Sequence, residues 1–175
     1  MPCKLTGLEI HREVDPARAS AHPIALIIDI DGLIWLNDYY GFSAGHQAIA
    51  GVAKVIQLRS SHFPNAHVSR VGGDEFLVLL PGTEFDEAHG LAQSIVDSVT
   101  ALAIDYRRQD EPKRTILSVN VVVFRVTPAM ITVGQTDHRL PIWDWFRVLI
   151  YEAKIDGGQR TGLVVNACEA VWSSK

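Results

Sequence analysis

Two adjacent carboxylates, Asp74 and Glu75, follow a pair of glycines in the segment VSRVGGDEFLVLLPG, which covers 68–82. The apolar run Phe76–Leu80 has the length of a buried strand and ends at Pro81-Gly82. The acidic pair is therefore expected in the turn of a β-hairpin. Glycine, aspartate and glutamate are ordinary residues of solvated turns, so this pattern alone favours a plain turn over a functional one.

A third carboxylate, Asp29, ends another apolar segment. The stretch IALIID, from Ile24 to Asp29, is predicted to be a buried strand that stops at its acid. If this strand lies beside the hairpin, Asp29 and Asp74 face one point. Carboxylates held that close cannot both stay charged without a counter-charge, so the pair calls for a divalent cation. Ligand sets made only of oxygen favour Mg²⁺ or Mn²⁺.

The elements that must position these acids follow one another as β-α-β-β-α-β. Apolar residues at helical spacing predict amphipathic helices, and an acidic loop is expected between the first strand and the first helix. The remaining predicted elements are helices at about 45–58, 88–102 and 146–153, strands in ILSVNVVVFRV and TGLVVN, a charged link at 105–114 and a long loop at 127–141. This order predicts an α+β fold with a ferredoxin-like βαββαβ core, an appended helix and strand, and helices on one face of a mainly antiparallel sheet.

The composition fits one soluble globular domain. The chain has 175 residues, of which 47% are hydrophobic and 21% charged, enough to bury a core. A net charge of −4 with scattered basic residues argues against nucleic-acid binding. The longest apolar run, Ile24–Ile28, is too short to cross a membrane. Cys3 and Cys168 lack metal-ligand spacing, so we expect a cytoplasmic protein with two inert thiols.

Four motifs together resemble the GGDEF domains of diguanylate cyclases, which join two GTP molecules into cyclic di-GMP and release pyrophosphate. The GGDEF signature stands unbroken at Gly72–Phe76. LTGL at Leu5–Leu8 resembles the family's opening turn, and DIDGLIWLNDYYGF, from Asp29, is similar to its DIDxFKxINDxxGH segment. YEAKIDGG, from Tyr151, is similar to its closing YxAKxxGRN. The order and approximate spacing also match over nearly the whole chain, which implies the palm-like cyclase form of the ferredoxin-like core.

The resemblance implies a metal centre and a catalytic acid. It makes Asp29 and Asp74 side-chain ligands of Mg²⁺ or Mn²⁺, with the Ile30 carbonyl as a third protein ligand. Glu75 becomes the acidic residue beside the attacking 3′-hydroxyl, either as a base or as a ligand of a second metal. Metal ions in such a centre neutralise the triphosphate and stabilise the leaving pyrophosphate.

The resemblance also implies how the nucleotide is held. Gly72 and Gly73 let the backbone approach the nucleotide where a Cβ would collide. Asn37 matches the family's guanine-contacting asparagine, and Lys154 matches a lysine on the terminal phosphates, where it acts as a point charge. His46 stands where the family has an aspartate that reads guanine.

Several positions depart from the family pattern. Ile34 stands in place of a lysine and Gly158 in place of an arginine, so two cationic phosphate contacts are missing. Arg160 is a possible substitute, although an arginine there is more often only solvated. Asn120 occupies the glycine position of the family's SIG motif. The segment FPNA, at 63–66, lies where many members carry a product-binding RxxD motif, so we expect no product feedback at this surface.

Three parts and two interpretations follow. We expect a lead-in with the LTGL turn over 1–23, a GGDEF domain over 24–166 and a C-terminal tail over 167–175. The leading interpretation is a nucleotidyl cyclase of diguanylate cyclase type, a homodimer that brings two GTP molecules face to face. The alternative is a degenerate module that binds a nucleotide or a protein partner without turnover. The missing cations favour the module, and the intact GGDEF turn with Asp29 favours the enzyme.

Overall fold

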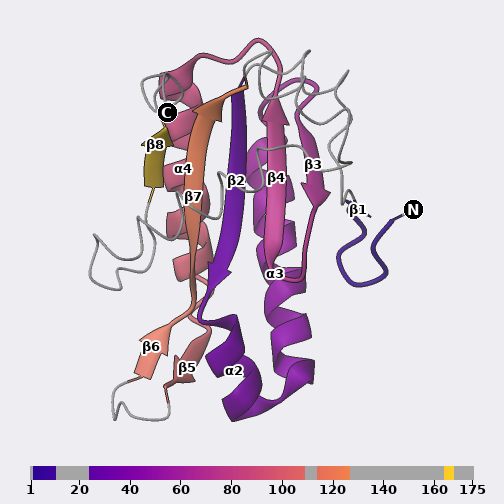
Figure 1. Ribbon diagram of the computed structural model, residues 1–175, viewed down its shortest axis with the longest axis vertical. Coiled ribbons are helices and arrows are strands. Elements are labelled where there is room, and N and C mark those ends of the chain that lie inside the picture. The colour runs from indigo at the N-terminus through magenta and orange to yellow at the C-terminus, as the bar shows by residue number, and fades with distance from the viewer. Residues whose placement is uncertain (1, 11–23, 109–113, 127–163, 168–175) are drawn as a thin grey trace, which may run out of the picture.

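A six-stranded mixed sheet forms the body of the protein (Figure 1). The computed structural model describes residues 2–10, 24–108, 114–126 and 164–167. The strands lie in the order β1-β3-β4-β2-β7-β8 across the sheet. Their bounds are β1 Glu9–Ile10, β2 Ile24–Asp31, β3 His67–Arg70, β4 Glu75–Leu80, β7 Ser118–Arg125 and β8 Val164–Ala167.

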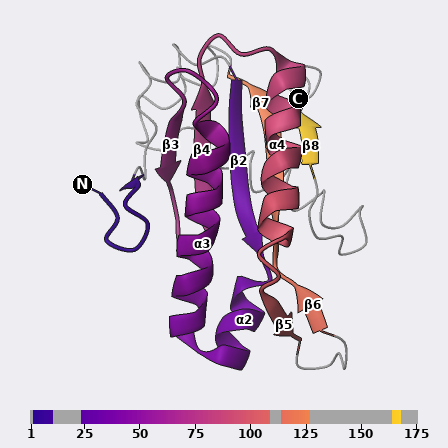
Figure 2. The ribbon, with the colours of Figure 1, turned by 180° about the vertical axis from the view of Figure 1, so that it is seen from behind.

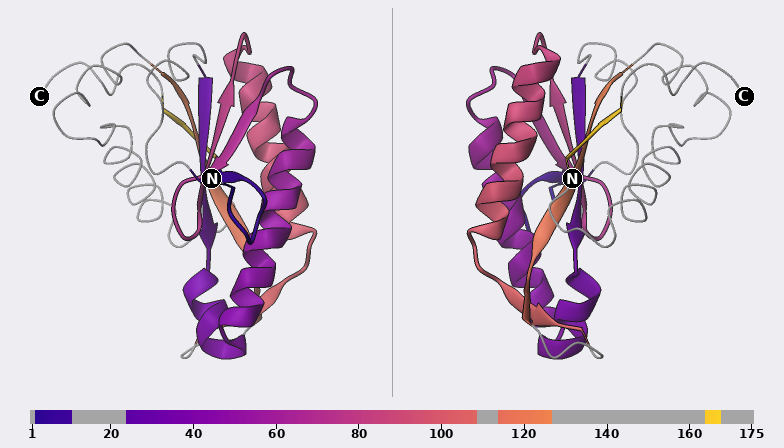
Figure 3. Two further views of the ribbon diagram at one scale, coloured as in Figure 1. Left: turned by 90° about the vertical axis from the view of Figure 1, so that its right-hand side faces the viewer. Right: turned by 90° about the vertical axis from the view of Figure 1, so that its left-hand side faces the viewer.

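The four central strands and two long helices confirm the predicted βαββαβ core. β2 is antiparallel to both β4 and β7, and β3 is antiparallel to β4. Helix α3, Phe42–Ser60, lies between β2 and β3 along the chain, and helix α4, Phe85–Thr100, lies between β4 and β7. Figures 2 and 3 show both helices on the same face of the sheet. The order of the central strands brings β2 beside the β3–β4 hairpin, as the placement of the acids requires.

Alternate side chains of the central strands face the two helices. On β2, the core is joined by Ile24, Leu26, Ile28 and Ile30, which pack with apolar residues of α3 and α4. Because successive side chains of a strand point to opposite faces, Asp29 points away from these helices. The burial of its neighbours therefore fixes the face on which the acid lies.

One segment predicted as a loop contains a helix. Helix α2, Leu33–Tyr40, occupies the expected acidic loop, and α3 begins at Phe42, a little before the predicted start. α2 follows Gly32, whose φ is 85°, has no side-chain cap, and buries only Leu33 and Leu36. A short helix with so narrow an apolar face and no cap leaves little signal in the sequence.

The charged link predicted at 105–114 contains a hairpin instead. β5, Asp105–Arg107, pairs antiparallel with β6, Arg114–Ile116, in a separate two-stranded sheet. Tyr106 of this hairpin is fully buried, and its ring lies so close to Gly32 that any Cβ there would collide with it. The hairpin thus holds the start of α2 against the end of β2, next to the acids.

The two ends of the described chain add the outer strands. The LTGL turn is present, with the Gly7 N–H donating to the Cys3 carbonyl at 2.8 Å, and it leads into β1, which pairs parallel with β3. β8 confirms the strand predicted in TGLVVN and pairs parallel with β7. The helix predicted at 146–153 and the loop at 127–141 lie outside the described residues. No described helix is long and apolar enough to span a membrane.

Candidate active site

The turn between β3 and β4 carries the glycine pair, and it is the hairpin turn that the sequence predicts. The Val71 N–H donates to the Glu75 carbonyl at 2.9 Å, which closes the hairpin over the residues between them. A Cβ on Gly72 would collide with the Glu75 carboxylate, so glycine allows this side chain to fold over the turn. A Cβ on Gly73 would meet nothing within 4 Å, which leaves open space beside the backbone there.

The register of β2 and β4 brings two carboxylates face to face. Asp29 lies directly opposite Glu75. The Ile30 N–H donates to the Asp74 carbonyl at 3.2 Å, so Ile30 and Asp74 form a hydrogen-bonded pair. Asp29 and Glu75 are therefore the neighbouring non-hydrogen-bonded pair, the kind in which facing side chains come closest. Both acids are half-buried, so their charges are only partly screened by water.

The sequence predicts that Asp29 and Asp74 lie next to each other, and the register adds Glu75 to these two acids. The direct cross-strand neighbour of Asp29 is Glu75, and Asp74 lies one residue further along, in the turn. Register depends on the geometry of the hairpin turn, which the apolar pattern of the strands does not specify. All three carboxylates belong to the same end of the β2–β4 pair.

The donor set at this end of the sheet consists of oxygen atoms. Asp29 and Asp74 supply carboxylates, and the Ile30 carbonyl points to the same side of β2 as its N–H, toward the turn. Such a set fits Mg²⁺ or Mn²⁺ better than a softer metal. Among the described residues, no three His, Cys, Asp or Glu side chains gather as a ready-made metal cluster. A cation here would depend on two side chains, a backbone carbonyl and oxygens of a bound nucleotide.

Asn37 lies where α2 meets α3. A Cβ on Gly45 would collide with the Asn37 side-chain oxygen, so this glycine lets the asparagine pack against the first turn of α3. The Oδ1 atom is buried and has no hydrogen-bond partner among the residues that the structure describes. Leaving a buried acceptor unpaired costs about 1–3 kcal/mol, so a ligand that offers an N–H group gains by binding here.

The other predicted nucleotide contacts are only partly described. His46 follows Gly45 in α3 and is exposed beside the Asn37 contact. Ile34 of α2 is 66% exposed, so a neutral side chain occupies the surface position of the family's lysine. Lys154, Gly158 and Arg160 lie outside the described residues.

Arg70 contacts the signature turn, a role that the sequence does not predict. Its Nη2 donates to the Gly73 carbonyl, and its Nη1 donates to Cys3 Sγ at 3.1 Å. Burial raises the pKa of the Cys3 thiol, but hydrogen bonds from Thr6, Arg70 and Leu5 outweigh burial and lower this pKa to about 6. The lowered pKa favours the thiolate form of Cys3, and the inertness of this thiol stays a prediction. No local motif marks the contact, because 67 positions separate the two residues.

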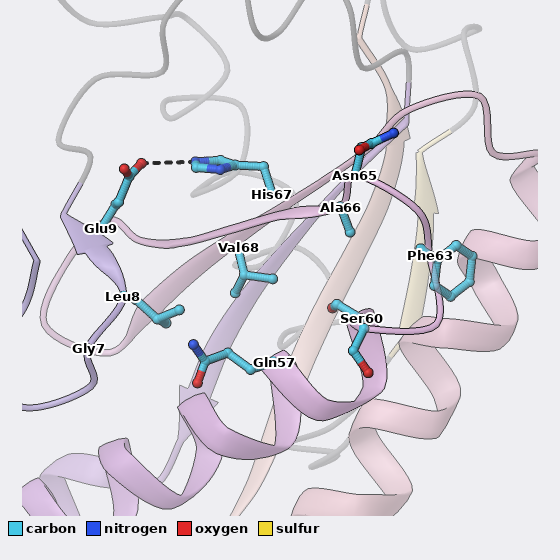
Figure 4. Close-up of a pocket in the computed structure, with 11 residues that line it drawn as sticks. Gly7, Leu8, Glu9, Gln57, Ser60, Phe63, Asn65, Ala66, His67 and Val68 are labelled. Carbon is cyan, nitrogen blue, oxygen red and sulfur yellow. Dashed lines mark ion pairs between the residues drawn. The ribbon is translucent and has the colours of Figure 1, made fainter.

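A separate pocket of about 490 Å³ lies at the other end of α3 (Figure 4). It is lined by the N-terminal turn, the end of α3, the loop that contains Phe63, Asn65 and Ala66, and the start of β3. At its rim, Glu9 and His67 form an ion pair with an N–O distance of 3.6 Å. The lining residues include no arginine or lysine, so the pocket offers a carboxylate where an anionic ligand would need cations.

Comparison with known proteins identifies the family. The family model described as "Diguanylate cyclase, GGDEF domain" matches residues 5–138. The chain is 31% identical over 160 residues to the probable diguanylate cyclase DgcT of Escherichia coli, covering 90% of this chain and 33% of that protein. It is 31% identical over 141 residues to diguanylate cyclase A of Treponema denticola, covering 81% and 35%. The chain thus spans about a third of the length of these relatives.

Solved structures share the fold. The GGDEF domain of DgcB from Caulobacter crescentus, in complex with cyclic di-GMP, superposes with a TM-score of 0.70 at 23% identity, and the match covers 94% of each chain. Diguanylate cyclase SiaD of Pseudomonas aeruginosa, in complex with its activator SiaC, also gives a TM-score of 0.70, at 24% identity over 95% of this chain and 61% of that one. The family model and the fold agree, and the chain belongs to the GGDEF domain family of diguanylate cyclases.

Proposed function

We propose that this chain is a nucleotidyl cyclase of diguanylate cyclase type, which condenses two GTP molecules into cyclic di-GMP and pyrophosphate with Mg²⁺ or Mn²⁺. The observation that carries the proposal is the direct cross-strand pairing of Asp29 with Glu75, beside Asp74 in the turn. Like charges placed directly opposite each other destabilise a sheet, so the arrangement favours a bound cation. A plain turn has no need of three carboxylates at one end of a strand pair.

Each residue near the turn has a distinct task in this proposal. Asp29, Asp74 and the Ile30 carbonyl hold the cation. When bound, the cation neutralises charge on the triphosphate and stabilises the leaving pyrophosphate. Glu75 lies beside the attacking 3′-hydroxyl, where its carboxylate accepts the proton or provides an oxygen ligand for a second cation.

The base and the phosphates are held by residues outside the turn. The buried Oδ1 of Asn37 has no partner within the described part of the chain and accepts a hydrogen bond from guanine. His46 lies next to this contact and takes part in base selection. Gly72 and Gly73 keep side chains away from the nucleotide, and Lys154 provides a positive charge for its terminal phosphates.

Ring closure requires two copies of the chain. Each domain holds one GTP, and two 3′-hydroxyl attacks must each find the α-phosphate of the other nucleotide. Two domains facing each other about a twofold axis place the reacting groups together and turn an encounter of separate molecules into a step within one complex. We therefore propose a homodimer as the active form.

A second candidate function is a binding module that holds a nucleotide or a protein partner without turnover. It is favoured by the exposed neutral side chain of Ile34, where the family's lysine provides a cation. With fewer cationic side chains, the triphosphate is bound more weakly. The transition state is affected more than the bound substrate, because negative charge develops on the leaving pyrophosphate. Binding then persists while catalysis declines.

Incubation with GTP and Mg²⁺, followed by mass spectrometry of the products, tests the proposal. We expect cyclic di-GMP and pyrophosphate from the wild-type chain and neither from Glu75→Gln, which keeps the shape of the side chain and removes its charge. Glu9→Gln is the matched control, because Glu9 pairs with His67 at the rim of the distant pocket. This control should keep full turnover.

Thermal denaturation with GTP and Ca²⁺ separates the two functions, because a ligand that binds only the folded state raises the melting temperature. A rise without product identifies the module. If no product forms and the melting temperature does not rise at millimolar nucleotide, both functions are rejected.

A further inference from the structure

The N-terminal turn is fixed at the sheet edge beside the signature turn. The Cys3 N–H donates to the Leu8 carbonyl at 2.6 Å, and the Gly7 N–H donates back to the Cys3 carbonyl at 2.8 Å. β1 then pairs in parallel with β3, so that Ile10 lies opposite Arg70. Cys3 is only 6% exposed, so its sulfur has a defined position inside this turn.

Arg70 connects the two turns through one guanidinium group. Nη1 donates to Cys3 Sγ and Nη2 donates to the Gly73 carbonyl, while Nε is buried and has no hydrogen-bond partner in the described ranges. The guanidinium is planar and permanently charged, so its two terminal nitrogens are held in a fixed relation to each other. Moving the sulfur therefore moves the donor that holds Gly73.

We propose that Cys3 and Arg70 are positioning residues that set the conformation of the Gly72–Asp74 turn. The sulfur holds Arg70, Arg70 holds the Gly73 carbonyl, and that carbonyl orients the acid that follows. The inference rests on the proposed function in one respect, namely that Asp74 is a ligand of the cation.

The two glycines explain why the signature turn needs a hydrogen bond to fix its backbone. Gly72 and Gly73 have no side chains to restrict their backbone, so the turn has more conformations available than most hairpin turns. The Gly73 carbonyl and the Asp74 N–H belong to one planar peptide group. A hydrogen bond to this carbonyl therefore orients the peptide plane that begins Asp74.

The strength of the hold depends on the charge of the sulfur. Arg70 is charged in every variant, so a thiolate adds the attraction of an ion pair to the hydrogen bond, which a neutral acceptor does not. The lowered pKa of Cys3 supports a charged sulfur at neutral pH. A serine at this position has a similar size but stays neutral, whereas an aspartate restores the negative charge.

The test compares four versions of the 175-residue chain: wild type, Cys3→Ser, Cys3→Asp and Cys168→Ser. The amide resonances of Gly73 and Asp74 in ¹H–¹⁵N spectra report the turn conformation directly, without nucleotide. We expect them to shift in Cys3→Ser and to return toward their wild-type positions in Cys3→Asp. Cys168→Ser is the matched thiol control and should leave them unchanged.

Calorimetric titration of GTP with Ca²⁺ provides the functional readout. Loss of the negatively charged acceptor that holds Arg70 should weaken binding by about tenfold in Cys3→Ser, with recovery in Cys3→Asp. Arg70→Lys gives a second route should Cys3→Ser fold poorly, because lysine keeps the charge but cannot bridge two acceptors with a planar fork. It should shift the same two resonances.

The outcomes separate the inference from the proposed function. If Cys3→Ser and Arg70→Lys both leave the Gly73 and Asp74 resonances unchanged, the positioning role is rejected. If wild type binds no GTP with Ca²⁺ but the resonances still shift and recover, the positioning role stands and the proposed function falls. Equal loss of binding in Cys3→Ser and Cys3→Asp would also contradict the inference, because charge would then be irrelevant.

Discussion

At the scale of single residues, we expect His46 to affect the selectivity for guanine over adenine. The Watson–Crick edge of guanine presents two adjacent N–H donors, which a carboxylate with two acceptor oxygens can satisfy together. Neutral imidazole has one acceptor and one donor on opposite sides of its ring, so it cannot accept hydrogen bonds from both guanine donors. One unpaired donor costs about 1–3 kcal/mol, so preference for GTP over ATP should be roughly tenfold to a hundredfold weaker in wild type than in His46→Asp.

Calorimetric titration of GTP and ATP into both proteins, with Ca²⁺ to block turnover, measures this preference. His46→Gln serves as a control that changes the side chain without adding charge. A strong preference for GTP in wild type, unchanged in His46→Asp, would mean that the base is read elsewhere, with Asn37 the first candidate.

Cys3 should make stability depend on pH. Its pKa of about 6 in the folded protein lies below the value of 9.0 for a free thiol, because hydrogen bonds from Thr6, Arg70 and Leu5 outweigh the effect of burial. A group whose pKa is depressed by folding stabilises the protein fully above its unfolded pKa, and this contribution disappears as pH falls through the folded pKa. The contribution of Cys3 should therefore decline between about pH 9 and pH 6.

Urea denaturation of wild type and Cys3→Ser over this range provides the measurement. The difference in unfolding free energy between the two proteins cancels other titrating groups, including the Glu9–His67 pair at the same edge. We expect the advantage of wild type to shrink steadily toward pH 6. A difference that is constant with pH would show that the sulfur does not titrate in this range.

At the scale of elements, two glycines of α3 should respond in opposite ways to alanine. A Cβ on Gly45 would collide with the Asn37 side chain, whereas a Cβ on Gly51 would make an ordinary contact of 3.6 Å with Leu102. Gly45→Ala should destabilise the protein by about 1–3 kcal/mol because it overpacks the α2–α3 contact. Gly51→Ala should stabilise it by about 0.5–1 kcal/mol because alanine favours the helix.

Chemical denaturation of the two variants checks both signs, and nucleotide titration adds a second readout. Gly45→Ala displaces Asn37 and should also weaken GTP binding, while Gly51→Ala should leave it unchanged. Equal effects of the two substitutions would argue against a specific contact between the helices.

The elements that the sequence predicts correctly are those with a strong apolar pattern. β2 and β4 are nearly continuous apolar runs, and α4 repeats apolar residues at helical spacing over its whole length. α2 and the β5–β6 hairpin escape prediction because they are short and depend on a tertiary contact, the burial of Tyr106 against Gly32. Local propensity cannot report a contact between residues so far apart in the chain.

The candidate site also contains some features that the sequence predicts and others that it does not. The acids are evident from their positions at strand ends, and the motifs imply the roles of Asn37 and His46. The direct pairing of Asp29 with Glu75 depends on register, and the contact of Arg70 with Cys3 depends on the parallel pairing of β1 with β3. Both are long-range arrangements that no spacing in the sequence encodes.

At the scale of the whole molecule, the pocket beyond α3 bears on feedback by the product. Cyclic di-GMP carries two phosphates, and the lining of the pocket offers the carboxylate of Glu9 and no arginine or lysine. We predict no tight binding of cyclic di-GMP at this surface, because a desolvated anion needs a paired cation. Calorimetric titration should show no saturable submicromolar binding.

A pair of variants makes this prediction sharper. Phe63→Arg with Ala66→Asp places an arginine and an aspartate at the spacing of the family's product-binding motif, and Leu58→Arg is a control that adds one cation on the exposed surface of α3. If only the double variant binds cyclic di-GMP, the missing charges explain why wild type does not bind it. Submicromolar binding already present in wild type and lost on mutating Asn65 would contradict it.

The two-residue strand β1 has a consequence for solubility. It lies at one end of the strand order and covers the backbone of β3, pairing at Ser69 and Arg70. Without it, the unpaired N–H and C=O groups of β3 would be a template for strand addition from another molecule. Deleting residues 2–10 should therefore favour concentration-dependent aggregation, detectable by light scattering, in a protein whose central sheet is otherwise intact. The short strand β1 thus protects the edge of the sheet from amyloid-like strand addition. Proteolytic cleavage after Ile10 would remove this protection.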